Sequence, residues 1–117
     1  MEVTIKNNVR PHGDTFDIRP LNELVTIPRA AIYTIWTYDS SSEKNPYPLL
    51  YVGQSGNLEE RLDKSHHKYQ CWVSHAISNT LLAGYWLTPS EQYSADKRKQ
   101  LESDLIAAYK PVCNDKA

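Results

Sequence analysis

Residues 49–62 read LLYVGQSGNLEERL, and this stretch decides the fold. Its first five residues are aliphatic or aromatic up to a glycine, a composition typical of a strand that ends at Gly53. Asn57 has the side chain of a helix N-cap, and Glu60, three residues later, stands at the carboxylate position of a capping box. Two leucines four residues apart follow the cap on one helical face. The stretch therefore predicts a strand over 49–53 and a helix that begins at Asn57.

The segment before this strand supplies an antiparallel partner. Residues 31–38, AIYTIWTY, are dense in β-branched and aromatic side chains and predict a strand. Residues 39–48 are rich in Ser, Asn and Pro, so the two strands form a hairpin with a long loop. Residues 1–27 have few paired apolar positions, and we expect an arm or edge segment there with one short helical turn near 21–25. Residues 28–117 then form the main domain.

The rest of the chain adds helices and one more strand. Apolar residues at helical spacing between 72 and 77 predict a helix, and residues 81–87 predict a third strand. A long helix runs from about Ser94 to Pro111, where the proline ends it. Because a hairpin comes first and the helices follow, we expect an α+β domain with a small three-stranded antiparallel sheet flanked by helices.

Composition limits the classes of function. The 117 residues carry 13 Lys and Arg against 14 Asp and Glu, a formal net charge of -1, so nucleic-acid binding requires a local basic patch. No apolar run is long enough to span a bilayer, and residues 1–10 contain no signal-like hydrophobic region. We therefore expect a cytoplasmic protein that binds no membrane. In that reducing compartment Cys71 and Cys113 would be free thiols.

Four features carry chemistry, and they occur in a fixed order along the chain. They are Ala31-Ile32-Tyr33, then Tyr51-Val52-Gly53, then Asn57 with Arg61, and finally Glu102 with Asn114. In this order and spacing they resemble the GIY-YIG nuclease family over residues 28–114. The resemblance implies a GIY-YIG-like fold and a metal-dependent endonuclease that hydrolyses DNA phosphodiester bonds.

The resemblance assigns a catalytic role to four side chains. Tyr33 would orient or deprotonate the attacking water, with Tyr51 as a supporting hydroxyl on the neighbouring strand. Arg61 would clamp the phosphate, because its planar fork of donors matches phosphate oxygens. Glu102 would hold Mg²⁺ or Mn²⁺, since one hard carboxylate with several waters suits such an ion. Both tyrosines can emerge on one face of the hairpin if the strand register allows it.

Three further features show how closely the chain follows the family pattern. Ala31 replaces the first glycine of the name motif, a change that an ordinary strand tolerates. The place one helical turn after the arginine is Ser65, so His66 becomes the preferred proton shuttle or phosphate ligand and His75 a weaker candidate. Asn114 matches the family's late asparagine and would brace the site.

A local basic patch is the expected DNA-binding surface. A run of three cations at 97–99 is usually a solvated helix face, but its place beside Glu102 suits contact with the DNA backbone. The residues assigned to DNA contact are Lys64, Lys68, Lys97, Arg98, Lys99 and Asn114. Because the net charge implies weak DNA affinity, we expect specificity to come from a partner protein, from homodimerisation or from DNA shape.

Two alternatives remain open. His66, His67, Cys71 and His75 could ligate zinc, but a small zinc domain usually has two ligand pairs and no Cys-x-x-Cys is present. The chain could instead be a non-catalytic module that uses the same fold to bind nucleic acid or protein. The intact tyrosine pair, arginine and glutamate favour catalysis, because a binding module has no chemical need for all of them.

Overall fold

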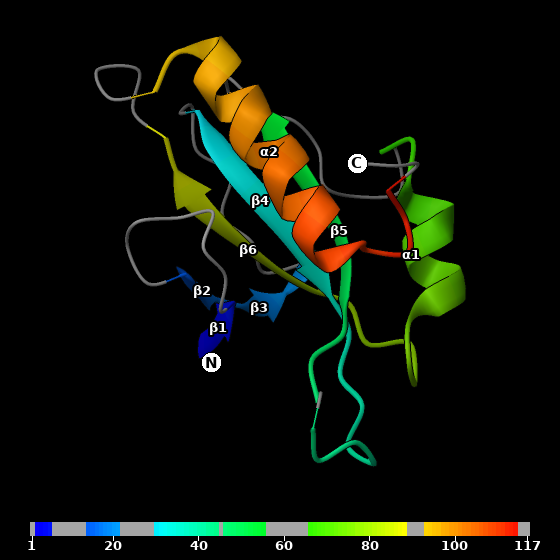
Figure 1. The fold of residues 1–117 in the computed structure, drawn as a ribbon. Helices are drawn as coiled ribbons and strands as arrows, with labels where there is room; N and C mark the ends of the chain where they lie inside the picture. Colours follow the sequence, from blue (N-terminus) through cyan, green and yellow to red (C-terminus); the bar gives the residue numbers. More distant parts are fainter. Residues whose placement is uncertain are drawn as a thin grey trace.

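The described part of the chain forms six strands and two helices (Figure 1). The computed structural model describes residues 2–5, 14–21, 30–44, 46–55, 66–88 and 93–114. The elements are β1 (Glu2–Ile5), β2 (Asp14–Asp17), β3 (Arg19–Pro20), β4 (Ala31–Trp36), β5 (Leu49–Ser55), α1 (Tyr69–His75), β6 (Leu82–Leu87) and α2 (Ala95–Tyr109). Four strands form an antiparallel sheet in the order β3-β6-β4-β5, and β1 pairs with β2 in a separate ladder.

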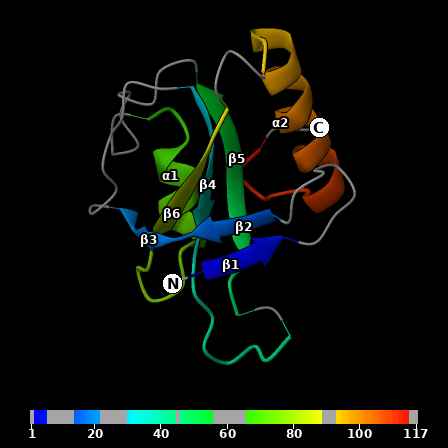
Figure 2. The ribbon, with the colours of Figure 1, turned by 90° about the vertical axis from the view of Figure 1, so that its left-hand side faces the viewer.

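The central element is β4, because β5 and β6 pair with it on either side and a helix covers each face of the sheet (Figure 2). All six residues of β4 are buried. On one face Ile32 and Val52 pack with Leu105 of α2, and on the other Tyr51 packs with Trp72 of α1. Alternate residues of β4 and β5 therefore point toward different helices, as the period of a strand requires.

Most of the predicted elements are confirmed, and so is the α+β class. The strands β4, β5 and β6 and the helix α1 lie in or overlap the predicted stretches. The N-cap of α2 is Ser94, whose hydroxyl accepts the Lys97 amide hydrogen at 3.1 Å, and the helix ends at a left-handed Lys110 before Pro111. The helix predicted from Asn57 lies outside the described residues. Neither described helix has the length and apolar character to cross a membrane.

The expected three-stranded sheet is wrong in its number of strands. The two-residue strand β3 adds a fourth, with Arg19 opposite Ala83 and Pro20 opposite Leu82 of β6. Such a short strand has no alternating pattern that a sequence could reveal, and its proline is tolerated because β3 lies at the edge of the sheet. The N-terminal residues expected as an arm or edge segment thus contribute an edge strand of the sheet, while the helical turn near 21–25 lies almost wholly outside the described residues.

The expectation of free thiols is also wrong, because Cys71 and Cys113 form a disulfide with their Cα atoms 5.7 Å apart. The bond joins α1 to the segment that follows α2, across 42 residues of sequence. The expectation was based on cellular compartment alone. Compartment does not determine which cysteines the packing of helices brings together.

The outer edge of β5 is covered by the segment after α2, which runs from the end of α2 toward α1 (Figure 1). The Cys113 N–H donates to the Leu50 carbonyl at 2.9 Å. Val52 donates its N–H to Asn114 Oδ1 and accepts from Asn114 Nδ2, both at 2.9 Å. These bonds satisfy edge groups that would otherwise be open to another strand. Asn114 therefore braces the strand that carries Tyr51.

Candidate active site

Two tyrosines lie side by side on the face of the sheet that α1 covers. The register pairs Tyr33 with Gly53 and Tyr51 with Ile35, so the two phenols are diagonal neighbours on one face. Their ring centroids are 6.0 Å apart, and each side chain is 7% exposed. The buried Trp72 of α1 packs against Tyr51 at a centroid distance of 5.5 Å. The phenols are therefore held in place by both the strands and the helix.

His66, just before α1, contacts both phenols. Its Nε2 lies 2.9 Å from Tyr33 Oη, and its ring meets the Tyr33 and Tyr51 rings edge-on at 6.1 and 5.5 Å between centroids. Trp72 packs against the same imidazole, with centroids 4.5 Å apart. Tyr33, Tyr51 and His66 together are called the tyrosine–histidine cluster below.

The tautomer of His66 follows from its second hydrogen bond. The Lys68 backbone N–H donates to His66 Nδ1 at 3.0 Å. Because a backbone amide can only donate, Nδ1 is unprotonated, and the neutral imidazole carries its proton on Nε2. Nε2–H therefore donates to Tyr33 Oη, and the phenol keeps its own proton for another acceptor. His66 in this state positions Tyr33 and does not deprotonate it.

Position 53 requires a glycine because the Tyr33 ring lies very close to the backbone there. A Cβ at this position would lie 2.8 Å from Tyr33 Cε1 and nearer still to Cζ and the hydroxyl oxygen. The backbone of Gly53 has no positive φ, so conformational freedom is not the reason for a glycine here. The absence of a side chain at Gly53 of β5 thus leaves room for the phenol of Tyr33 on the neighbouring strand β4.

We expect Gly53→Ala to destabilise the fold by about 1–3 kcal/mol, because overpacking of this size forces the ring away from its position beside His66. Urea unfolding measures the change. A double-mutant cycle with Tyr33→Leu identifies the cause, since the leucine removes the atoms nearest to the new Cβ. Gly53→Ala should then lower the free energy of unfolding much less in the Tyr33→Leu background than in the wild type. Equal losses in both backgrounds would show that the collision with the Tyr33 ring is not the cause.

Glu102 lies on the other side of β5, on α2. Its carboxylate accepts a hydrogen bond from the backbone N–H of Gln54. Burial raises the pKa of Glu102 above its ordinary value, while the Gln54 N–H and the nearby charge of Lys99 act in the opposite direction. The loss of solvation disfavours the ionised form of Glu102, and a bound cation would compensate for that loss.

Arg98 stands one helical turn before Glu102 and is only 7% exposed. Its Nε donates to Gln54 Oε1 at 2.9 Å, so Gln54 contacts Glu102 through its backbone and Arg98 through its side chain. The neighbouring Lys97 and Lys99 are exposed. The three cations therefore do not form one solvated surface, because the middle one packs against the end of β5.

The tyrosine–histidine cluster lies on the α1 side of the sheet, and Glu102 lies on α2, which covers the other side. Gly53 faces Tyr33, and the next residue, Gln54, holds Glu102. The structure thus brings the phenols and His66 into one group and places the carboxylate in a second group on the α2 side of the sheet. Lys68 contributes its backbone N–H to the first group. The assigned residues that lie outside the described part are Arg61 and Lys64.

Sequence reasoning missed Gln54, although a signal for it was present. Gln54 directly follows Gly53, so the period of the strand places its side chain on the face opposite Tyr33, toward α2.

A second set of potential ligands was missed in part: Cys71, His75 and Cys113 gather at the end of α1. Sulfur and imidazole are not ligands that Mg²⁺ prefers, so this set does not bear on the ion expected at Glu102.

Comparison with known proteins identifies no relative of this chain. No family model matches the chain, and neither a curated protein nor a solved structure matches it at a significant level.

Proposed function

We propose that this protein is a metal-dependent endonuclease that hydrolyses DNA phosphodiester bonds. The observation that carries the proposal is the hydrogen bond from His66 Nε2–H to Tyr33 Oη, 2.9 Å long, beside Tyr51 and opposite Gly53. A phenol that receives a fixed donor is oriented, and its deprotonated form is stabilised. Such a phenol is suited to orient a water molecule that attacks phosphorus and, once it has given its own proton to another acceptor, to take a proton from that water.

Glu102 supports the metal dependence of the proposed reaction. Its half-buried carboxylate is a hard oxygen donor whose ionised form lacks full solvation, and both properties fit Mg²⁺ or Mn²⁺. A divalent ion held there would supply charge stabilisation to the phosphate oxygens. Gln54 orients this carboxylate, and Arg98 in turn fixes the Gln54 side chain.

Two further roles follow from position, and that of Arg61 follows from the resemblance. Tyr51 lies against both Tyr33 and His66 and provides a second hydroxyl on the same face. Lys97 and Lys99 are exposed on α2, on the helix that carries Glu102, and suit contact with the DNA backbone. Arg61 keeps the phosphate-clamping role that the resemblance to the GIY-YIG family implies.

The proposal is tested by incubating the purified protein with duplex, nicked, flap and four-way-junction DNA in Mg²⁺, Mn²⁺ or EDTA. We expect cleavage of at least one substrate with either metal and none in EDTA, while the circular dichroism spectrum is the same in all three. DNA binding without cleavage under every condition would instead support a non-catalytic module on the same fold.

A further inference from the structure

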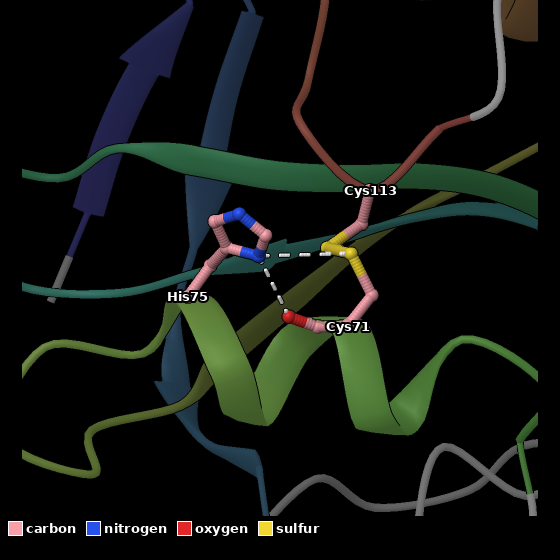
Figure 3. Close-up of side chains that lie close together, drawn as sticks. All are labelled: Cys71, His75 and Cys113. Atoms are coloured by element: carbon pink, nitrogen blue, oxygen red, sulfur yellow. Dashed lines mark hydrogen bonds between the residues drawn. A yellow bond between two sulfur atoms is a disulfide. The ribbon is translucent and has the colours of Figure 1, made fainter.

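We propose that Cys71, His75 and Cys113 form a Zn²⁺ site when their disulfide is reduced. One ligand atom from each residue lies within 4.8 Å of the others (Figure 3). Cys71 and His75 are four residues apart on α1, so they share a helical face, and Cys113 approaches from the segment after α2. Two thiolates and one imidazole, with water as the fourth ligand, are an attested donor set for zinc.

The distance between sulfur and nitrogen fits this ion. Zn–S bonds of about 2.3 Å and Zn–N bonds of about 2.0 Å place the two ligand atoms of a tetrahedral site about 3.5 Å apart. Cys71 Sγ and His75 Nδ1 are 3.7 Å apart in the structure. Two sulfurs on one zinc lie about 3.8 Å apart, a separation that rotation about the Cα–Cβ bonds can produce once the disulfide is open.

His75 needs a change of tautomer and a turn of its ring away from the Cys71 carbonyl oxygen. Its Nδ1 now lies 3.0 Å from the Cys71 carbonyl oxygen and donates a proton to it (Figure 3). Zinc binding at Nδ1 would move that proton to Nε2, where solvent can accept it because His75 is exposed. The bond given up is an exposed one between neutral groups, so its loss costs little.

The chemistry of the conversion balances with an external dithiol as reductant. The dithiol transfers two electrons and two protons to the protein, which breaks the bond between Cys71 and Cys113 and leaves the reductant as a disulfide. Zn²⁺ then replaces the two thiol protons, so one ion bound releases two protons to solvent. In oxidising surroundings the sulfurs are joined directly, and in reducing surroundings they are joined through the metal.

The cross-link connects the two segments that hold Tyr51 and its strand, α1 and the segment after α2. On one side α1 carries Trp72, which packs against Tyr51. On the other side the Cys113 N–H binds the Leu50 carbonyl, and Asn114 binds Val52. A zinc ion in the reduced protein would preserve this connection between α1 and the edge of β5. The inference does not depend on the proposed nuclease activity.

Cobalt provides the test, since Co²⁺ substitutes for Zn²⁺ and its absorption reports ligand type and geometry. The full chain, reduced with a phosphine under argon, should bind one Co²⁺ with sulfur-to-cobalt charge transfer and the intense visible bands of tetrahedral coordination. Zn²⁺ should displace the cobalt, and its binding should release two protons per chain. The oxidised protein should show none of these bands. Reduction should lower the Tm, and one equivalent of Zn²⁺ should restore most of the loss.

His75→Ala and the matched control His67→Ala assign the third ligand. We expect His75→Ala to weaken Co²⁺ binding by at least about tenfold and to alter the visible bands, while His67→Ala leaves both unchanged. Identical cobalt affinity and spectra in His75→Ala and the wild type would overturn the site, as would an absence of charge transfer in the reduced wild type. Should His75→Ala fail to fold, the wild-type spectrum and the proton count still decide the matter.

Discussion

Glu102→Gln should reduce DNA cleavage by at least about 10³-fold and at the same time raise the Tm at neutral pH. The amide keeps the shape of the side chain and its ability to accept the Gln54 N–H, but it has no charge to hold a divalent cation. The stability should rise because the wild-type carboxylate is half-buried, and its ionisation in the folded state is disfavoured by lost solvation.

The gain in stability should depend on pH in a defined direction. The pKa of Glu102 is raised in the folded protein above its ordinary value of 4.5, so the folded state binds the proton more tightly than the unfolded state. Below that ordinary value the carboxyl is neutral in both states, and its favourable contribution is fully present. The contribution is lost as the pH rises through the folded pKa. The difference in Tm between Glu102→Gln and the wild type should therefore grow from acid to neutral pH.

Thermal melts from pH 4 to pH 7, with and without Mg²⁺, measure these effects. Mg²⁺ should raise the Tm of the wild type at neutral pH and leave that of Glu102→Gln unchanged. Asp104→Asn is the matched control, because Asp104 lies on the same helix and accepts a hydrogen bond from Gln100. Its cleavage rate should equal that of the wild type. Normal cleavage by Glu102→Gln would remove this carboxylate from the proposed site.

Tyr33→Phe should lower the cleavage rate by about 10²–10⁴-fold, the usual contribution of a positioned acid or base. The substitution removes one hydroxyl and leaves the ring against Gly53 and Tyr51. It also leaves the His66 Nε2–H without its acceptor at Tyr33, so we expect a loss of about 1–3 kcal/mol in the free energy of unfolding. Single-turnover cleavage and urea unfolding measure the two effects.

Tyr85→Phe is the control for this experiment. Tyr85 of β6 stands directly opposite Tyr33 in the register, on the same face of the sheet, but on the side away from β5. Removal of its hydroxyl should leave the cleavage rate within a factor of two of the wild type. Equal rates for Tyr33→Phe and Tyr85→Phe would show that the Tyr33 hydroxyl takes no part in the chemistry. A large loss in Tyr51→Phe alone would transfer the main role to Tyr51.

The sequence alone determined the elements that have a strong local pattern. The aromatic and β-branched runs predicted β4 and β5, and Ser94 and Pro111 predicted the two ends of α2. The alternation of a strand also implied that Tyr33 and Tyr51 could share a face, and the structure places them there. These features depend on residues close together in the chain, and a local pattern records them directly.

Only the tertiary structure decided which distant groups meet. The disulfide between Cys71 and Cys113, the fourth strand β3 and the bond from Arg98 to Gln54 each join segments with no shared local pattern. The Nε2 tautomer of His66 likewise depends on a backbone N–H and a phenol that the fold brings to opposite nitrogens of one ring. Such contacts are set by how the helices and strands pack, because packing chooses among many partners that the same sequence pattern allows.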